Sequence, residues 1–116
     1  MEVVVNLTLA TICYLGQCHP ALVGNDTRPG TYAVQKRLVR QPGYGGDVLS
    51  YRETPTEIYA IHRVYTLKPK QRREYRLYHG TVAERQNVTG GCINIDPIVY
   101  DNLAKNWNNI KLVIRY

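Results

Sequence analysis

The sequence contains no phenylalanine, one tryptophan and one methionine among its 116 residues, but it contains ten tyrosines. Its aromatic side chains are therefore almost all amphipathic. Such side chains suit a wet cleft, and they equally suit a small domain whose aromatics lie between core and solvent. Repeats and low-complexity tracts are also absent. We therefore expect a single domain over 1–116 with one hydrophobic core.

A long hydrophobic run is missing as well. No stretch reaches the roughly 20 apolar residues that a membrane-spanning helix needs, so we expect no membrane span. The N-terminal segment has neither a basic region nor a clean apolar core, which argues against a signal peptide. The chain is then expected to be intracellular, delivered from elsewhere, or separated from a targeting segment.

Acidic residues are few, with 9 Asp and Glu against 15 Lys and Arg, which gives a net charge of +6. This excess favours an anionic partner, such as nucleic acid, an acidic lipid surface or a polymer with free carboxylates. The segment from 63 to 76 holds six basic residues and only one acid, Glu74. Such a segment can bind single-stranded nucleic acid or form a hairpin arm or short helix with a solvated face. Because no recognisable reader motif accompanies the charge, we expect no nucleic acid partner.

Cysteine is scarce, with three residues. Cys13 and Cys18 flank a predicted turn and are either paired across a hairpin, in an oxidising compartment, or two independent thiols. Cys92 follows two glycines in Thr89-Gly90-Gly91-Cys92-Ile93-Asn94. A thiol beside backbone N–H groups is what acyl transfer through a thioester requires. A buried cysteine behind a glycine turn has the same pattern.

Most of the remaining chain has the pattern of strands. Alternating apolar residues at 3–9, and β-branched or aromatic runs at 31–39, 57–65 and 110–116, predict strands. Within 57–65 the period of two places one set of residues on one face. That set is Ile58, Ala60, His62 and Val64. The segments 24–30 and 41–47 are rich in turn formers and predict loops.

One clear helix is expected after Cys92. Asp96 has the character of an N-cap and Pro97 that of a first helical residue. The helix is predicted over 97–107, with Ile98, Leu103 and Trp107 facing inward. The predicted fold class is therefore mainly β with one clear helix.

An ordered set of motifs resembles the L,D-transpeptidase catalytic domain. Thr27-Arg28-Pro29-Gly30-Thr31-Tyr32 is similar to the family's Thr-Pro-x-Gly-x-Phe/Tyr signature, and Thr89–Asn94 is similar to its Ser/Thr-x-Gly-Cys-Ile-Arg/Asn nucleophile motif. Ile61-His62-Arg63-Val64 and Arg72–Leu77 resemble a branch of the family that has asparagine after Cys-Ile. The match runs from about Val3 to Val113. It implies an L,D-transpeptidase-like β-sandwich or partly open barrel.

The resemblance also implies a cell-wall enzyme located in the periplasm or cell wall. Such domains use a cysteine, with no cofactor or metal, to attack the bond between diaminopimelate and the terminal D-alanine of a peptidoglycan stem tetrapeptide. The acyl-enzyme is then resolved by a stem amine, a free D-amino acid or water. Two alternatives remain open, namely a catalytically silent wall-binding module and a basic nucleic-acid-binding domain.

The resemblance assigns roles to several residues of the nucleophile motif. Cys92 is the nucleophile, and the backbone N–H groups of Gly91 and Cys92 are candidates for the oxyanion hole. Thr89 occupies the position whose backbone carbonyl orients the catalytic histidine. Gly90 departs from the family pattern, because many members have a second histidine there.

Asn94 is a further departure, because many members have arginine at this position. Its amide can hold a substrate carbonyl or carboxylate, but without a fixed charge. Arg73, Arg76 or Arg85 is expected to supply the missing cation.

The catalytic base is expected to be His62, in the Ile-His-Arg strand of the same branch. The alternative is His79, which lies in a His-Gly-Thr sequence found in many family members. If His62 is the base, His79 is a solvated or rim residue of the substrate site. His19 matches nothing in the family.

Overall fold

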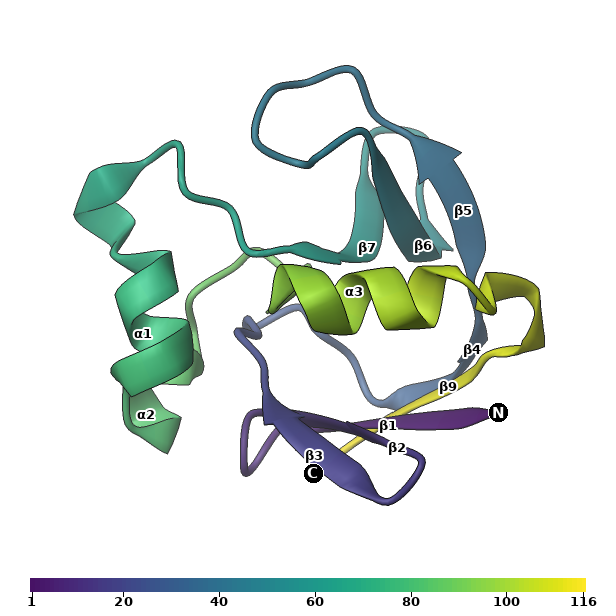
Figure 1. Ribbon diagram of the computed structural model, residues 1–116, viewed down its shortest axis with the longest axis horizontal. Coiled ribbons are helices and arrows are strands. Elements are labelled where there is room, and N and C mark those ends of the chain that lie inside the picture. Colours follow the sequence, from purple (N-terminus) through teal and green to yellow (C-terminus); the bar gives the residue numbers. More distant parts are fainter.

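Two β-sheets enclose the hydrophobic core in the computed structural model, which describes residues 1–116 (Figure 1). The first sheet has five strands in the order β3-β2-β1-β9-β4, and the second has four in the order β5-β6-β7-β8. The strands of the first sheet are β1 (Glu2–Asn6), β2 (Thr11–Tyr14), β3 (Gln17–Pro20), β4 (Gly30–Ala33) and β9 (Lys111–Arg115). Those of the second are β5 (Gln35–Leu38), β6 (Asp47–Glu53), β7 (Ile58–Arg63) and β8 (Ile93–Ile95).

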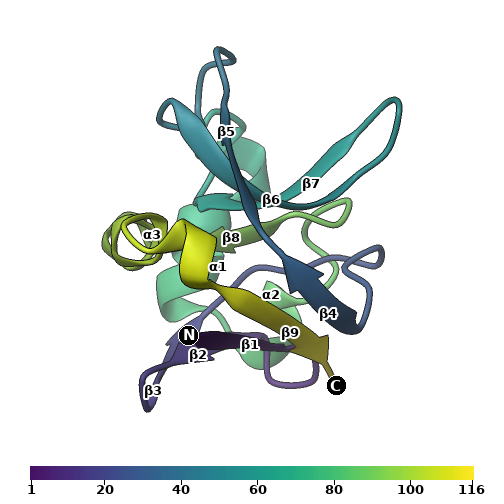
Figure 2. The same ribbon diagram turned by 90° about the vertical axis from the view of Figure 1, so that its right-hand side faces the viewer.

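The segment 31–39, predicted as one strand, contributes to both sheets. Its first part pairs with β9 as β4, and its second part pairs with β6 as β5. Val34, which lies between them, is buried. The chain therefore crosses from one sheet to the other at this residue, and the crossing links the two layers of the fold (Figure 2).

The core is formed by alternate residues of strands in both sheets. Val3 and Val5 of β1 are fully buried, as the alternation predicts, while Leu9 lies in a turn and is exposed. Ile61 of β7 and Ile93 of β8 are buried from the second sheet. This arrangement follows from the pleat, which sends successive side chains to opposite faces.

Helix α3 (Pro97–Ala104) lies beside the two sheets and begins as predicted (Figure 1). The Asp96 carboxylate caps it by accepting hydrogen bonds from the backbone N–H groups of Ile98 and Val99. Its buried residues are Val99, Tyr100 and Leu103, whereas Ile98 is 71% exposed. The inward placement of Ile98 was therefore wrong. At 3.6 residues per turn, residues five apart lie about 140° apart around the axis, so Ile98 and Leu103 cannot share one stripe.

A helical lobe (residues 66–86) lies at the left of Figure 1, between β7 and β8 in the sequence. It contains the 3₁₀ turn η1 (Pro69–Gln71) and the short helices α1 (Arg73–His79) and α2 (Val82–Arg85). Leu77 anchors it by packing with Leu22 and Val64 in a second, small apolar cluster. The basic segment is therefore helical rather than a hairpin arm. A further 3₁₀ turn, η2 (Trp107–Asn109), precedes β9. None of the helices has the length and apolar character that a membrane-spanning helix requires.

Cys13 and Cys18 form a disulfide across the β2–β3 hairpin. The two residues are direct register partners in neighbouring antiparallel strands. Cys92, on the second sheet, is the free cysteine. The structure thus resolves the two alternatives for Cys13 and Cys18 in favour of pairing.

Replacing Cys13 and Cys18 together by serine is expected to lower stability without changing chemistry at Cys92. Because the disulfide closes a short loop, its loss should cost about 2 kcal/mol. The melting temperature should fall by roughly 5–15 °C, and the rate of Cys92 acylation should stay near wild type. A large loss of rate at unchanged melting temperature would contradict the separation of the disulfide from the reactive thiol.

Candidate active site

The parallel pairing of β7 with β8 places His62 and Cys92 on one face of the second sheet. Ile61 pairs with Ile93, and His62 pairs with Asn94. Because side chains alternate along both strands, Ala60 and His62 share a face with the residues at 92 and 94. Neighbouring strands lie about 4.8 Å apart. Two residues that are distant in the sequence are therefore brought together, and both line one cavity of 820 Å³.

His62 is held in a single tautomer by its own strand. Its Nδ1 lies 2.7 Å from the backbone carbonyl oxygen of Arg63. A carbonyl oxygen only accepts hydrogen bonds, so Nδ1 carries the proton and Nε2 is the basic nitrogen. The expected partner of the histidine was the carbonyl of Thr89, and this expectation is wrong. Arg63 takes that place because it follows His62 directly at the end of β7.

Burial sets the protonation states of both groups. It lowers the pKa of His62 to about 4, and the nearby charge of Arg73 acts in the same direction, while the hydrogen bond to Arg63 opposes them. Burial also raises the pKa of the Cys92 thiol, although the Ala60 backbone and the charge of Arg73 lower it in part. At neutral pH the pair is therefore a neutral imidazole and a neutral thiol. The thiol proton has to move during attack.

The backbone N–H of Cys92 is the free donor next to the sulfur. It makes no hydrogen bond within the protein. The N–H of Gly91, the other expected oxyanion donor, is occupied, because it donates to the hydroxyl of Thr89 at 3.1 Å. That hydroxyl in turn donates to the Cys92 carbonyl at 2.6 Å. Thr89 therefore closes the nucleophile turn through its side chain, and the assignment of the Gly91 N–H to the oxyanion hole does not fit this geometry.

Gly91 connects the two motifs that resemble those of the L,D-transpeptidases, namely Thr27–Tyr32 and Thr89–Asn94. Its carbonyl accepts hydrogen bonds from Thr27, at 2.9 Å, and from the hydroxyl of Tyr51, at 2.6 Å. Its φ is +149°, and a Cβ there would lie 2.5 Å from the ring of Tyr59. Only glycine fits both the backbone conformation and the space. The Thr27–Tyr32 segment thus fixes the turn that presents Cys92.

Tyr44 covers the outer side of the histidine and was missed in the sequence. Its ring contacts His62 edge to face at a centroid distance of 4.8 Å. Arg63 holds the loop that carries it, donating to the carbonyl of Tyr44 at 3.1 Å and to the carboxylate of Asp47 at 2.9 Å. The only sequence signal was an aromatic residue within a glycine-rich loop. Its contact with His62 is a tertiary contact, and no local sequence pattern predicts it.

Asn94 is fully buried and does not face the cavity as a substrate ligand. Its Oδ1 accepts hydrogen bonds from the Tyr65 backbone at 3.0 Å and from Arg73 Nη1 at 3.2 Å. The expected direct contact of Asn94 with substrate is therefore not supported. Asn94 instead holds Arg73 near His62, with which Asn94 pairs across β7 and β8.

Of the three arginines proposed as the missing cation, Arg73 is the one that contacts Asn94, the register partner of His62, and its charge lowers the pKa of both His62 and Cys92. Arg76 is half-buried behind it and donates to the carbonyl of Gln71. Arg85 donates to the carbonyls of Leu9, Ala10 and Gly80, so it joins the lobe to the first sheet. The structure does not bring Arg85 to the cavity.

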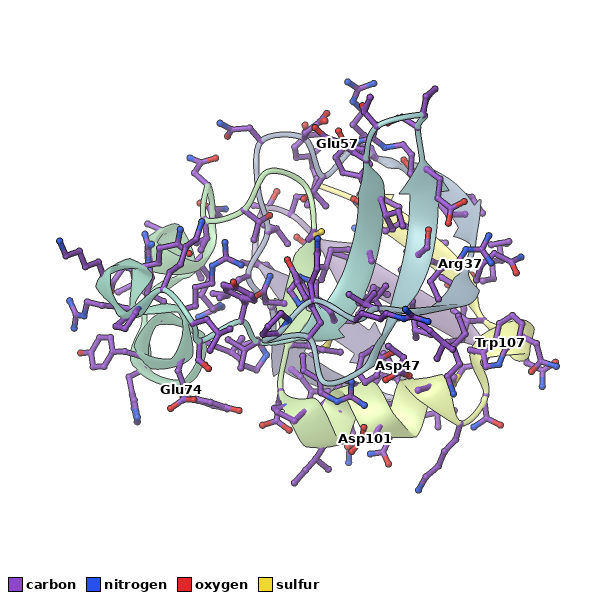
Figure 3. All side chains as sticks on the ribbon, turned by 90° about the horizontal axis from the view of Figure 1, so that it is seen from above. Arg37, Asp47, Glu57, Glu74, Asp101 and Trp107 are labelled. Atoms are coloured by element: carbon purple, nitrogen blue, oxygen red, sulfur yellow. A yellow bond between two sulfur atoms is a disulfide. The ribbon has the colours of Figure 1, made fainter.

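His79 ends helix α1 and is exposed. Its ring lies against Tyr75, with a centroid distance of 5.5 Å, and it does not line the cavity that contains Cys92. The cavity is bounded instead by β5, by the turn between β6 and β7, and by the 41–47 loop. Figure 3 shows Arg37 and Glu57 on this side of the molecule and Glu74 on the lobe.

One solved structure has a similar fold. The crystal structure of Mycobacterium tuberculosis L,D-transpeptidase 1 matches 99% of this chain with a TM-score of 0.58 and 17% sequence identity. The fold resembles that of the L,D-transpeptidases. The predicted fold class is confirmed, with two short helices in the lobe besides α3. The chain spans 61% of that L,D-transpeptidase's length. No protein-family model and no curated protein matches the sequence.

Proposed function

We propose that this chain transfers acyl groups of peptidoglycan stem tetrapeptides through a thioester on Cys92. The observation that supports it most is the cavity shared by the free thiol and a neutral histidine whose Nε2 makes no hydrogen bond. A nucleophile beside a base that is itself oriented by a third group is the arrangement of covalent acyl transfer. The L,D-transpeptidase-like fold favours peptidoglycan as the substrate.

In the first step the Cys92 sulfur attacks the diaminopimelate carbonyl carbon while its proton passes to His62 Nε2. The resulting oxyanion is stabilised by the free N–H of Cys92. Collapse breaks the amide bond, and His62 returns the proton to the leaving nitrogen of D-alanine. The products of this step are the thioester and free D-alanine.

In the second step the thioester is resolved by an amine of another stem, by a free D-amino acid or by water. His62 removes the proton of the incoming nucleophile, and Cys92 leaves as the thiol. The transferase, exchange and carboxypeptidase outcomes thus share one acyl-enzyme and differ in the acceptor.

Arg73 is the residue we assign to a substrate carboxylate. It is held against Asn94 at 3.2 Å and is half-buried next to the reactive pair. A partly desolvated guanidinium binds a carboxylate more strongly than an exposed one does. We assign no direct substrate contact to Asn94.

The proposed location is the periplasm or cell wall, where the substrate lies. The disulfide between Cys13 and Cys18 agrees with an oxidising compartment of this kind. The L,D-transpeptidase-like fold likewise favours a site outside the cytoplasm.

Incubation with purified tetrapeptide muropeptides tests the proposal. Release of D-alanine together with a crosslinked, exchanged or shortened stem would support it. Saturable binding without turnover would favour a silent wall-binding module instead. Retention on RNA that falls steeply with rising salt, again without turnover, would favour a nucleic-acid-binding domain.

The pH profile of acylation follows from the lowered pKa of His62. The base must be neutral to accept the thiol proton, and its pKa is about 4. The acid limb of kcat/KM for the free enzyme should therefore fall near pH 4, instead of near the ordinary histidine value of about 6.5. Steady-state rates measured from pH 3.5 to 8 would check this. A limb centred near 6.5 would show that His62 is solvated or is not the base.

The lowered pKa of His62 also makes the free energy of unfolding depend on pH. The rate measurements therefore need a control for partial unfolding at low pH. Between about pH 6.5 and 4 the unfolded chain binds a proton at His62 that the folded chain does not, so stability decreases as the pH falls through this range. The free energy of unfolding should fall by about 3 kcal/mol in total for a pKa shift of this size. Rates should therefore be divided by the folded fraction, measured by circular dichroism at each pH.

A further inference from the structure

The positive charge of the protein is concentrated in the helical lobe. Five of the 15 Lys and Arg residues lie in 68–76, together with one acid, Glu74. This segment therefore carries a net charge of +4 out of the protein's +6. The five residues are Lys68, Lys70, Arg72, Arg73 and Arg76.

None of these five cations forms an ion pair within the protein. Six of the other ten do, with partners 2.6 to 4.0 Å away. The six are Arg28, Lys36, Arg37, Arg52, Arg63 and Lys111. The segment 68–76 is thus where cations without an ion pair are most concentrated, since the four others, Arg40, Arg85, Lys105 and Arg115, lie apart in the sequence.

Three of the lobe cations form an outer surface, which we call the cationic lobe surface (Lys68, Lys70 and Arg72). All three are exposed. Lys68 and Arg72 line a cavity of 190 Å³ together with Arg73, Thr66 and the acid Glu74, so three cations and one acid border it. This volume suits a single carboxylate and the atoms next to it.

The cationic lobe surface leads into the proposed active site through Arg73. Arg73 lines the small cavity, and it also contacts the buried Asn94 next to His62. The other side of the reactive pair has a balanced charge, because Arg37 and Arg40 line that cavity together with Glu53 and Glu57, and Arg37 is paired with Glu53 at 2.8 Å (Figure 3). An extended anionic substrate would therefore run from Cys92 over the lobe and not over the β6–β7 turn.

We propose that the cationic lobe surface binds carboxylates of the stem peptides that neighbour the reacting one in polymeric peptidoglycan. This inference rests on the proposed function. One contact favours carboxylates over nucleic acid: of the two exposed tyrosines on α1, Tyr75 has one ring face covered by the Arg72 guanidinium at 4.4 Å. That face is not open for stacking on bases, which single-stranded nucleic acid needs.

The test compares two triple variants in a Cys92→Ala background, which cannot consume the polymer. The lobe variant is Lys68→Gln/Lys70→Gln/Arg72→Gln. The control variant removes the same charge elsewhere, as Lys105→Gln/Lys111→Gln/Arg115→Gln. Binding to purified sacculi is measured by sedimentation at several salt concentrations, and folding is checked by circular dichroism.

The lobe variant should bind sacculi about tenfold more weakly than its parent, with a shallower salt dependence, since each exposed contact adds a modest amount. The control variant should bind like its parent. Sacculi whose carboxylates have been converted to amides should lose the same binding from the parent. Equal binding by both triple variants would overturn the proposal. Binding that survives amidation of the sacculi would also overturn it. So would binding that disappears when phosphate polymers are stripped from the sacculi.

Turnover separates this inference from the proposed function. With Cys92 intact, the lobe variant should turn over soluble tetrapeptides at the wild-type rate and sacculi at a reduced rate. If the wild type turns over no soluble tetrapeptide, the proposed function fails, while the sedimentation result still decides whether the lobe binds wall carboxylates. An equal loss on soluble and polymeric substrates would overturn the assignment of the lobe to neighbouring stems.

Discussion

Replacing Cys92 by alanine is expected to abolish covalent acylation, with a loss of turnover of roughly 10⁴-fold or more. The sulfur forms the thioester, and no nearby hydroxyl can replace it at neutral pH. The hydroxyl of Thr89 is the nearest alternative in the motif, but it is engaged with the Cys92 carbonyl at 2.6 Å. Intact-mass spectrometry with a carbapenem, an acylating inhibitor suggested by the family resemblance, should show one adduct on the wild type and none on Cys92→Ala.

The double replacement of Cys13 and Cys18 by serine is the matched control, because it removes the other two cysteines and retains Cys92. It should still form one adduct. The melting temperature of Cys92→Ala should stay near wild type, because the sulfur makes only weak hydrogen bonds, to the carbonyl of Ile58 at 3.8 Å and to the backbone of Ala60. An adduct that persists on Cys92→Ala would place the nucleophile elsewhere.

Replacing His62 by glutamine is expected to slow acylation by about 10²- to 10⁴-fold, the usual contribution of general base catalysis. The neutral thiol of Cys92 needs a proton acceptor, and Nε2 of His62 is the basic nitrogen that lines its cavity. Glutamine retains a side chain of similar reach with an amide N–H that can donate to the Arg63 carbonyl. It has no nitrogen that accepts a proton. The rate of adduct formation, measured by stopped mass-spectrometric sampling, checks the expected loss.

The control is His79→Gln, on helix α1. This exposed residue does not line the cavity, so the variant should acylate at nearly the wild-type rate. An inactive His79→Gln with an active His62→Gln would reverse the assignment of the base. Equal rates for all three proteins would show that acylation needs no histidine.

Local periodicity was enough to predict the face of the strand that carries the histidine. Of the four residues predicted on this face, Ala60, His62 and Val64 are buried, whereas Ile58, at the start of β7, is 49% exposed. The mainly β fold class was also predictable, because each strand has its own alternation of apolar residues. Which strands pair with one another could not be predicted from these patterns. The parallel pairing of β7 with β8 joins segments that are distant in the chain, and no local pattern encodes it.

The errors at the site have the same origin. The amide of Asn94 looked available for substrate, but in the fold the Tyr65 backbone and Arg73 occupy its oxygen. The guanidinium of Arg85 looked available too, but in the fold it donates to the carbonyls of Leu9 and Ala10, in the turn between β1 and β2, and to that of Gly80. A sequence shows which donors and acceptors exist. Which of them are already satisfied depends on tertiary contacts that only the folded chain defines.

The register between β7 and β8 has a consequence for how this protein can vary. The positions of His62 and Cys92 are set by the pairing of Ile61 with Ile93 across two adjacent strands. The helical lobe enters and leaves at the ends of those strands, so its length does not alter the separation of the two side chains. The outer part of the lobe can therefore change in length while His62 and Cys92 keep their separation, provided that Arg73 still contacts Asn94 and Leu77 still packs with Leu22 and Val64. Under the proposed function, the lobe residues that contact substrate can thus change while His62 and Cys92 stay in place.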